Sequence, residues 1–447
     1  METILIKALQ LIMSLSILVI IHECGHFMFA RLFKIRVEKF YLFFNPWFSL
    51  FKFKPKNSET EYGIGWLPLG GYVKIAGMID ESMDKEQLKL PPKPDEFRSK
   101  PAWQRLLVMV GGVLFNFILA FIIFSAVLFA WGDSYIPATS IKEGMTFSET
   151  VKKLGGYQEH DIILSFDGKP MNLREGVINM NTLMLFLDAK QAVVERDGRQ
   201  VTLLMPENFA EEVIASKDFP YDTWRPAKLD SVYASAKEAG LQKGDSILSV
   251  NGKPVASWTQ IASEISKETN KGQCISVAYL RDTAICTANV PVNEINGRNA
   301  IGIASAWNAE LDVQTDNYGF FAAVPAGISF GVETLKGYVA QARFIFSKSG
   351  FRELGGFGAI GNLFPAQWDW HAFWLMTAFL SIILAVMNIL PIPALDGGHV
   401  LFLLYELITR RKPSDKFLER AQVAGMALLF ALLIYANGND LFKAIFK

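Results

Sequence analysis

The stretch IIHECGH, residues 20–26, places ionisable groups at the end of a long apolar segment near the start of the chain. Positions four residues apart lie on one face of a helix, so His22 and His26 can share one metal ion. Two imidazoles and one carboxylate suit zinc and leave its fourth position to water. Zinc lowers the pKa of that water to about 7, and the adjacent Glu23 can take its proton. The motif therefore predicts a hydrolytic zinc site at membrane depth.

The third ligand has to come from another part of the chain. Asp396 lies in a second apolar stretch, NILPIPALDGGHV (residues 388–400), in which two prolines and two glycines predict irregular backbone. Such backbone is tolerated at membrane depth only where protein buries it or where it lines a water-filled cavity. We favour Asp396 as the third ligand, with His399 as a competing ligand or a neighbour. A helix cap at the cytoplasmic edge is the structural alternative for Asp396.

Four apolar segments are long enough to cross a membrane, since a span needs roughly 20 apolar residues. The composition agrees, because 51% of the chain is hydrophobic and 20% is charged. The first segment lacks a small-residue cleavage site, so we interpret it as a retained span rather than a signal peptide. The third is too long for one crossing, and its prolines must break it. The segments cover about residues 4–33, 106–131, 371–408 and 417–436.

The basic residues predict the orientation of these spans. Lys and Arg gather between the first and second spans and again between the third and fourth, so both segments are expected in the cytoplasm. Both termini and residues 132–370 then lie on the other side, which is the periplasm in a bacterium. The formal net charge of zero gives no indication of nucleic-acid binding. Residues 318–347 fit a fifth span or an interfacial amphipathic helix, and the charges in mid-segment favour the latter.

The large region between the second and third spans contains a repeat. GGYQEHDIILSFDGKPM (155–171) and AGLQKGDSILSVNGKPV (239–255) align Asp161 with Asp245, and each copy predicts a short strand that ends in a glycine turn. Asp197-Gly198 predicts a hairpin turn. Both copies resemble PDZ domains; the first departs from the pattern at His160, where the second has Gly244. Two rigid spacers without a ligand are the alternative. Cys274 and Cys286 are interpreted as unpaired thiols rather than a bridge.

Together these motifs resemble the site-2 protease family of intramembrane zinc metalloproteases. The HExxH of the first span and Leu395-Asp396-Gly397 of the third carry the resemblance, and the two PDZ-like modules are similar to its bacterial RseP type, the regulator of sigma-E protease. The resemblance covers essentially the whole chain. It implies a three-helix catalytic core in which His22, His26 and Asp396 hold Zn²⁺ and Glu23 is the catalytic base.

The resemblance also implies substrate-binding residues. Asn388 matches a family asparagine that holds substrate near the zinc, and Pro391 would free carbonyls by breaking the helix. The stretch YGIGWLPLGGYVKIAGM (62–78) resembles the family's membrane-reentrant β-loop, where an edge strand could pair with an unwound substrate. Gly70, Gly71 and Tyr72 are the residues expected to bind substrate there. Gly112 and Asn116 match a GxxxN pattern of the second span, which indicates close helix packing.

The expected fold is a polytopic α-helical membrane protein with four transmembrane helices, a membrane-reentrant β-loop and two extracytoplasmic PDZ-like domains. The expected divisions are 1–131, 132–221 (first PDZ-like domain), 222–308 (second), 309–370 (amphipathic linker) and 371–447. The resemblance implies cleavage of single-span substrates in the bacterial inner membrane, an anti-sigma factor or remnant signal peptides, with the modules as a size filter. Two alternatives stay open: a membrane scaffold with a vestigial metal site, and a peptidase that only clears signal peptides.

Overall fold

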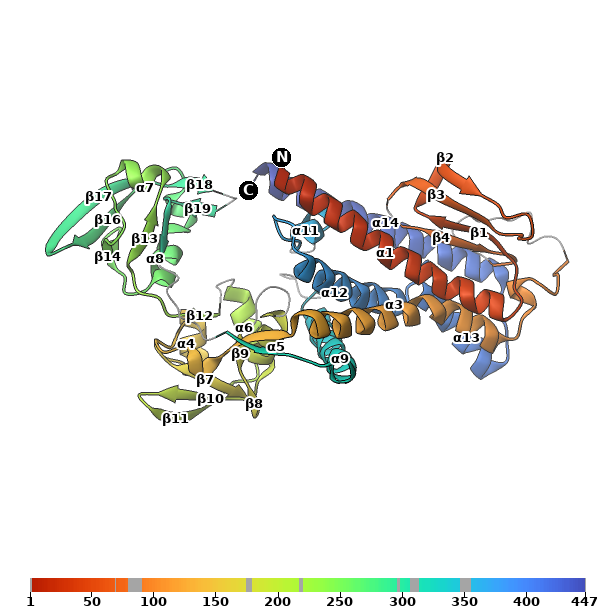
Figure 1. Ribbon diagram of the computed structural model, residues 1–447, viewed down its shortest axis with the longest axis horizontal. Helices are drawn as coiled ribbons and strands as arrows, with labels where there is room; N and C mark the ends of the chain where they lie inside the picture. Colours follow the sequence, from red (N-terminus) through yellow and green to blue (C-terminus); the bar gives the residue numbers. More distant parts are fainter. Residues whose placement is uncertain are drawn as a thin grey trace. The chain divides into compact units, whose positions relative to one another are not determined.

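The computed structural model describes residues 2–68, 70–78, 91–173, 179–216, 220–295, 298–305, 313–345 and 355–446. The chain forms two compact units, which are described separately below (Figure 1). The first consists of Met1–Asp133 and Asp316–Phe446, and the second of Ser134–Thr315. Some sequence predictions concern positions outside the described residues, namely Leu69 of the expected β-loop, the expected domain boundary at 308, and Ser347 at the end of the amphipathic segment.

Four helices of the first unit are long and apolar enough to cross a membrane, which confirms the number of predicted spans. The break in the third apolar stretch is also confirmed, because one helix ends at Ile389 and the next begins at Asp396. Proline has no N–H to donate and cannot continue the ladder of helical hydrogen bonds. The helices are α1 (Glu2–Leu32), α3 (Ala102–Trp131), α12 (Trp370–Ile389), α13 (Asp396–Thr409) and α14 (Asp415–Phe446); α13 is not one of the four candidate spans.

Helices α1 and α3 cross with their backbones in contact. A Cβ atom built on Gly25 would lie 2.2 Å from the carbonyl oxygen of Gly111, and one on Gly111 would lie 2.7 Å from that of Gly25. Small residues allow this approach in apolar surroundings, where close packing holds helices together. The close packing predicted from Gly112 and Asn116 is therefore present, and it also includes the glycine inside the HExxH motif. Helix α3 packs against α12 as well (Figure 1).

A helix of the first unit, α9 (Phe320–Ile345), corresponds to the segment for which a fifth span or an interfacial helix was expected. It is not among the candidate spans found in the described part of the chain. Gly327 and Gly331 lie against Ser125 and Phe121 of α3, so α9 packs along the second half of that helix. The remaining short helices of this unit are η1 (Phe97–Ser99) and α11 (Phe357–Gly361).

Beside α1 lies a four-stranded sheet that is larger than the predicted β-loop (Figure 1). It begins at Val37, before the predicted start at Tyr62. The second strand has aromatic residues at both even and odd positions, which hides its two-residue period from the sequence. Its strand order is β2-β3-β1-β4, so β4 is an edge strand. β1 pairs in parallel with β3 and antiparallel with β4. The strands are β1 (Val37–Leu42), β2 (Phe44–Phe53), β3 (Glu61–Leu67) and β4 (Tyr72–Ile75).

The second unit contains two modules with the same sheet topology, in agreement with the predicted repeat. The strand orders are β11-β10-β7-β8 in the first and β17-β16-β14-β15 in the second. The first sheet is built from β7 (Ile162–Phe166), β8 (Lys169–Pro170), β10 (Gln191–Arg196) and β11 (Arg199–Leu204). The second is built from β14 (Ser246–Val250), β15 (Lys253–Pro254), β16 (Cys274–Arg281) and β17 (Ala284–Pro291).

The remaining elements of this unit surround the two sheets. Those of the first module are β5 (Asp133–Pro137), η2 (Ala138–Ser140), β6 (Met145–Phe147), α4 (Glu149–Gly155), β9 (Asn172–Leu173), α5 (Asn179–Asp188), α6 (Phe209–Ser216) and β12 (Tyr221–Thr223). Those of the second are β13 (Leu229–Val232), α7 (Ala234–Glu238), α8 (Trp258–Ile265), η4 (Glu268–Asn270), β18 (Asn293–Ile295), β19 (Arg298–Ala300) and β20 (Ile303–Ser305), and β21 (Gln314–Asp316) follows it. Strand β12 pairs with β6 of the first module.

An ion pair recurs at equivalent places in the two modules. Arg196 donates two hydrogen bonds of 2.7 Å to Asp161, and Arg281 donates two of 2.8 Å to Asp245. Burial alone would raise the pKa of Asp245, but hydrogen bonds from Arg281 and from the Gln242 N–H hold that pKa below its ordinary value. The aspartates aligned in the sequence repeat therefore have the same structural role.

The replacement of glycine by His160 in the first copy leaves the backbone conformation of the turn similar. His160 has φ 68° and Gly244, at the equivalent position, has φ 96°, so both adopt left-handed backbone. The turn predicted at Asp197-Gly198 is confirmed, since both residues have positive φ between β10 and β11. The cysteines are free, as predicted; strand pairing places Cys274 opposite Pro291 and Cys286 opposite Tyr279.

The helix crossing predicts that Gly25→Ala destabilises the protein. The added methyl group would meet the Gly111 carbonyl, and overpacking of this kind costs about 1–3 kcal/mol. We expect a lower thermal midpoint for the purified protein in detergent. Gly438→Ala in α14 is the matched control, because a Cβ there meets nothing within 4 Å and alanine favours a helix. Equal midpoints for Gly25→Ala and the wild type would contradict the close crossing.

Candidate metal centre

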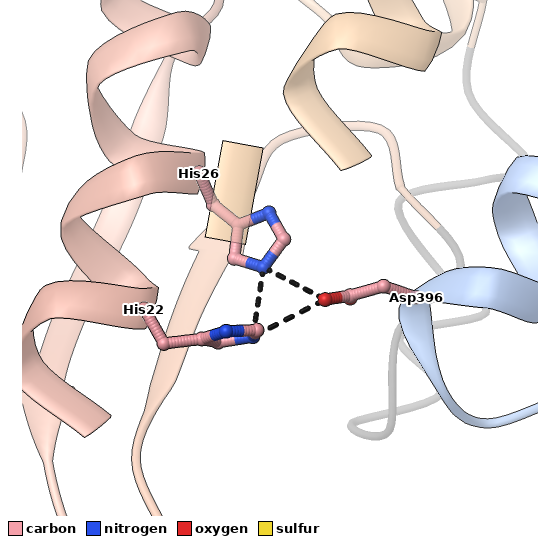
Figure 2. A group of neighbouring side chains, drawn as sticks. All are labelled: His22, His26 and Asp396. Atoms are coloured by element: carbon pink, nitrogen blue, oxygen red, sulfur yellow. Dashed lines mark hydrogen bonds and ion pairs between the residues drawn. The ribbon is translucent and has the colours of Figure 1, made fainter. Parts of the chain in front are cut away.

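Three predicted ligands meet in the first unit. His22 and His26 project from one face of α1, and Asp396 projects from the first turn of α13 (Figure 2). The Nε2 atoms of the two histidines lie 3.2 Å apart. Asp396 Oδ2 lies 3.2 Å from His22 Nε2 and 3.3 Å from His26 Nε2. Residues 370 and 374 positions apart in the sequence therefore present three ligand atoms to one point.

This triangle fits zinc in size as well as in chemistry. Tetrahedral zinc with bonds of about 2.0–2.1 Å places two neighbouring ligand atoms about 3.3–3.4 Å apart. The three observed distances of 3.2, 3.2 and 3.3 Å are close to that edge. Both histidines are buried, and Asp396 Oδ2 is a buried oxygen without a hydrogen-bond donor. A divalent cation would satisfy all three atoms and leave the fourth position facing the cavity.

The glycines of the LDGGH motif allow Asp396 to reach this point. A Cβ on Gly397 would lie 2.1 Å from the carbonyl oxygen of Leu390, and one on Gly398 would lie 2.6 Å from that of Ile392. The first turn of α13 therefore packs directly on the proline-containing loop that precedes it. A larger side chain at either glycine would push the helix away and move Asp396 with it.

Each histidine has a partner behind the proposed metal position. His26 Nδ1 lies 2.8 Å from the carbonyl oxygen of Val108, which orients the ring and leaves Nε2 free for a metal. The Asn116 side-chain amide lies 3.1 Å from His22 Nδ1, and its Oδ1, a buried oxygen without a partner among the described contacts, can accept from the Nδ1–H of a His22 that binds metal through Nε2. Ser381 donates a hydrogen bond of 2.7 Å to the Asn116 backbone carbonyl. Sequence reasoning had assigned Asn116 to helix packing only. The sequence did contain a signal for a further role, namely a polar amide within an apolar span, and the structure shows that this amide is fully buried.

A cavity of about 630 Å³ opens at the three ligands. Among the predicted site residues, Glu23, Asn388 and His399 line it. The predicted substrate-binding residues of the β-loop, Gly70, Gly71 and Tyr72, also line it. Pro391 is not among the lining residues, and its observed effect is the break between α12 and α13. His399 lies outside the group of potential metal ligands found in the described residues, so the geometry favours Asp396.

Two neighbours of the ligands face this cavity. Val73, on edge strand β4, lies beside the Glu23 carboxylate, and both line the cavity. The Asn388 amide lies 3.5 Å from His22 Nε2, which places it beside the position of the metal. Gly71 lets the sheet approach α1, since a Cβ there would lie 2.7 Å from Val19. A carboxylate, an amide and a strand edge thus surround one side of the ligand triangle.

Comparison with known proteins agrees with this chemistry. The family model described as Peptidase family M50 matches residues 10–432. A Vibrio cholerae protein whose name assigns it provisionally as a zinc metalloprotease is 26% identical, over 98% of this chain and 99% of that protein. The metalloprotease MmpA of Caulobacter vibrioides is 27% identical, over 98% and 96%. The regulator of sigma E protease of Haemophilus influenzae is 26% identical, over 97% and 98%.

The contact behind His22 predicts that Asn116→Leu weakens metal binding. Loss of the partner of a ligating histidine costs about 10–100-fold in metal affinity. We expect that decrease in zinc affinity, measured by competition with a chelator in detergent. Thr377→Val is the control, since this buried hydroxyl bonds only the Phe373 carbonyl of its own helix among the described contacts. An unchanged zinc affinity in Asn116→Leu would show that the amide does not support the ligand.

Proposed function

Because the chain belongs to peptidase family M50, the site-2 protease family of zinc metallopeptidases, we propose that it cleaves peptide bonds within transmembrane segments of single-span proteins. The observation that carries the proposal is the ligand triangle of His22, His26 and Asp396. Two of these ligands lie on a helix apolar enough to span a membrane. A site for hydrolysis at that depth has membrane-embedded peptide bonds within reach.

The proposed chemistry follows from the residues around the cavity. His22, His26 and Asp396 hold the zinc ion, which supplies Lewis-acid polarisation and a water of lowered pKa when bound. Glu23 takes the proton of the attacking water and passes it to the leaving amine. Val73 of edge strand β4 lies beside this carboxylate and lines the same cavity. The amide of Asn388 donates to the scissile carbonyl oxygen as negative charge develops there.

The substrate has to unwind before it can be cut, since a helical peptide bond is shielded by its own turn. Unwinding in lipid is costly unless the freed N–H and C=O groups find partners. Strand β4 is the edge of its sheet and lies beside Glu23, so an extended substrate segment can pair with it. Gly70, Gly71 and Tyr72 lead into this strand and line the same cavity. They form the substrate groove in this proposal.

The second unit is proposed to select substrates. Its two modules share a topology and a buried Asp–Arg pair, which supports a duplicated domain, and we assign both as PDZ-like. In the proposed orientation the positive-inside rule places the unit and both termini in the periplasm and the spans in the bacterial inner membrane. The sheet β1–β4 is the membrane-reentrant element, and α9 lies at the interface. The modules then reject proteins that carry bulky periplasmic domains.

The physiological substrate is proposed to be an anti-sigma factor or a remnant signal peptide. The relative from Haemophilus influenzae is named for the regulation of sigma E, which favours regulated proteolysis over signal-peptide clearance alone. The alternative of a scaffold with a vestigial metal site finds no support in the geometry. All three ligand atoms and Glu23 converge on one cavity, as an active centre requires.

The role of Glu23 predicts that Glu23→Gln abolishes cleavage and leaves zinc bound. The amide cannot accept the proton of the water, whereas the three ligands are unchanged. Cleavage of a tagged single-span substrate by purified protein in detergent, together with the zinc content, measures both effects. Glu333→Gln, at an exposed position of α9, is the control and should cleave like the wild type. Absence of zinc from the wild type would remove the basis of the enzyme proposal.

The size filter predicts that removal of the second unit relaxes selection. Ser134 and Thr315 at its two ends share a hydrogen bond of 2.9 Å, so a short linker from Asp133 to Asp316 can replace the unit. We expect this variant to cleave a substrate with a folded periplasmic domain, which the wild type leaves intact. The pre-trimmed substrate, cut by both proteins, shows that the active site survives. If the variant still rejected the untrimmed substrate, the proposal that the second unit is a size filter would be wrong.

A further inference from the structure

The loop between α12 and α13 carries Asp396 to the metal site, and most of its backbone amides donate to carbonyls of the same segment. Pro391 and Pro393 have no N–H. The Leu390 and Ile392 amides donate to the Met387 and Leu390 carbonyls, and the Leu395 amide donates to that of Ile392. Ala394 alone among these residues donates to a side chain of another helix. Its N–H lies 3.2 Å from Oε1 of Gln422 on α14.

Ala394 is also the strained residue of the loop. Its φ of 80° is left-handed, a conformation that a residue with a Cβ rarely adopts. Unlike Asn or Asp, alanine has no polar side chain to stabilise that conformation locally. The support therefore has to come from its surroundings. Asp396, the third ligand, follows only two residues later, so the conformation of Ala394 sets the direction in which α13 starts.

The face of α14 that meets this loop is built for close contact. Gln422 is only 4% exposed, although its neighbour Val423 is 47% exposed. Gly425 lies one turn further on, and a Cβ there would lie 1.7 Å from the carbonyl oxygen of Pro393. A buried amide in an apolar span is costly unless it is hydrogen-bonded. Gln422 therefore accepts a hydrogen bond from Ala394, and Gly425 lies directly against the backbone of Pro393.

We propose that Gln422 is a positioning residue for the metal site: through Ala394 it fixes the loop that presents Asp396 to the two histidines. The inference rests on the proposed function, because it assumes that Asp396 binds zinc. It assigns a function to α14 that the zinc-binding motifs, all on α1 and α13, do not contain. Gln422 acts through the backbone of the loop, although its side chain also lines the cavity.

The test compares zinc affinity in Gln422→Met with that of the wild type. Methionine keeps the length of the side chain but cannot accept the Ala394 N–H. We expect about a 10–100-fold loss in zinc affinity, as for other groups that orient a metal ligand. At saturating zinc, kcat should fall by a larger factor than KM rises, because the loss acts on the position of Asp396, whereas Gln422 is only one of the residues that line the cavity. Gln422→Asn, whose amide is one methylene too short to reach, should lose affinity in the same direction.

Two comparisons separate positioning from general stability. Gln10→Met is the matched control, since this buried glutamine of α1 bonds the Pro365 carbonyl about three turns away from His22. It should leave zinc affinity unchanged even where it lowers the thermal midpoint. Ala394→Gly should rescue much of the affinity lost in Gln422→Met, because glycine adopts left-handed backbone without support. No other role of Gln422 predicts this rescue.

The outcomes distinguish the inference from the function on which it rests. Wild-type protein that holds no zinc overturns the metal site and the inference with it. Wild-type protein that holds zinc, together with unchanged affinity in both Gln422 variants, overturns the inference alone. An equal loss in Gln10→Met, or no rescue by Ala394→Gly, also overturns it. Loss in the two Gln422 variants, with rescue by glycine, supports it.

Discussion

The metal site depends first on the backbone contact between α1 and α3 at Gly25 and Gly111. This contact brings His22 and His26 against α3, where Asn116 and the Val108 carbonyl orient their rings. A wider helix separation would leave both Nδ1 atoms without partners in an apolar environment, which is costly. The glycine inside the HExxH motif is therefore as much part of the site as the residues that bind the metal.

The second requirement is a controlled break in the third apolar stretch. A continuous helix through that stretch would carry Asp396 past the histidines, at 1.5 Å per residue. Two prolines follow the end of α12, and two glycines let the first turn of α13 pack directly against the loop. The backbone amide of Ala394 in this loop donates to Gln422 of α14. Irregular backbone at membrane depth is thus satisfied by protein, as the absence of water in lipid demands.

The two modules of the second unit are each stabilised by an Asp–Arg ion pair. In each module, a buried aspartate in the turn before one strand accepts hydrogen bonds from an arginine at the end of another strand. The two pairs lie at positions related by the repeat. Each pair joins residues of one module only, so its effect on stability is local to that module.

The sequence alone determined the features that depend on local spacing. The i, i+4 histidines, the four apolar spans, the proline break, the repeat and the Asp197-Gly198 turn are all readable from neighbouring residues. The structure groups Asp396 rather than His399 with His22 and His26, in the irregular backbone that the surrounding prolines and glycines predict. Only the tertiary structure decided the sheet that begins at Val37, the contact of Asn116 with His22 and the hydrogen bond from Ala394 to Gln422. The two side-chain contacts join residues 94 and 28 positions apart, and no local period encodes which helix faces which loop.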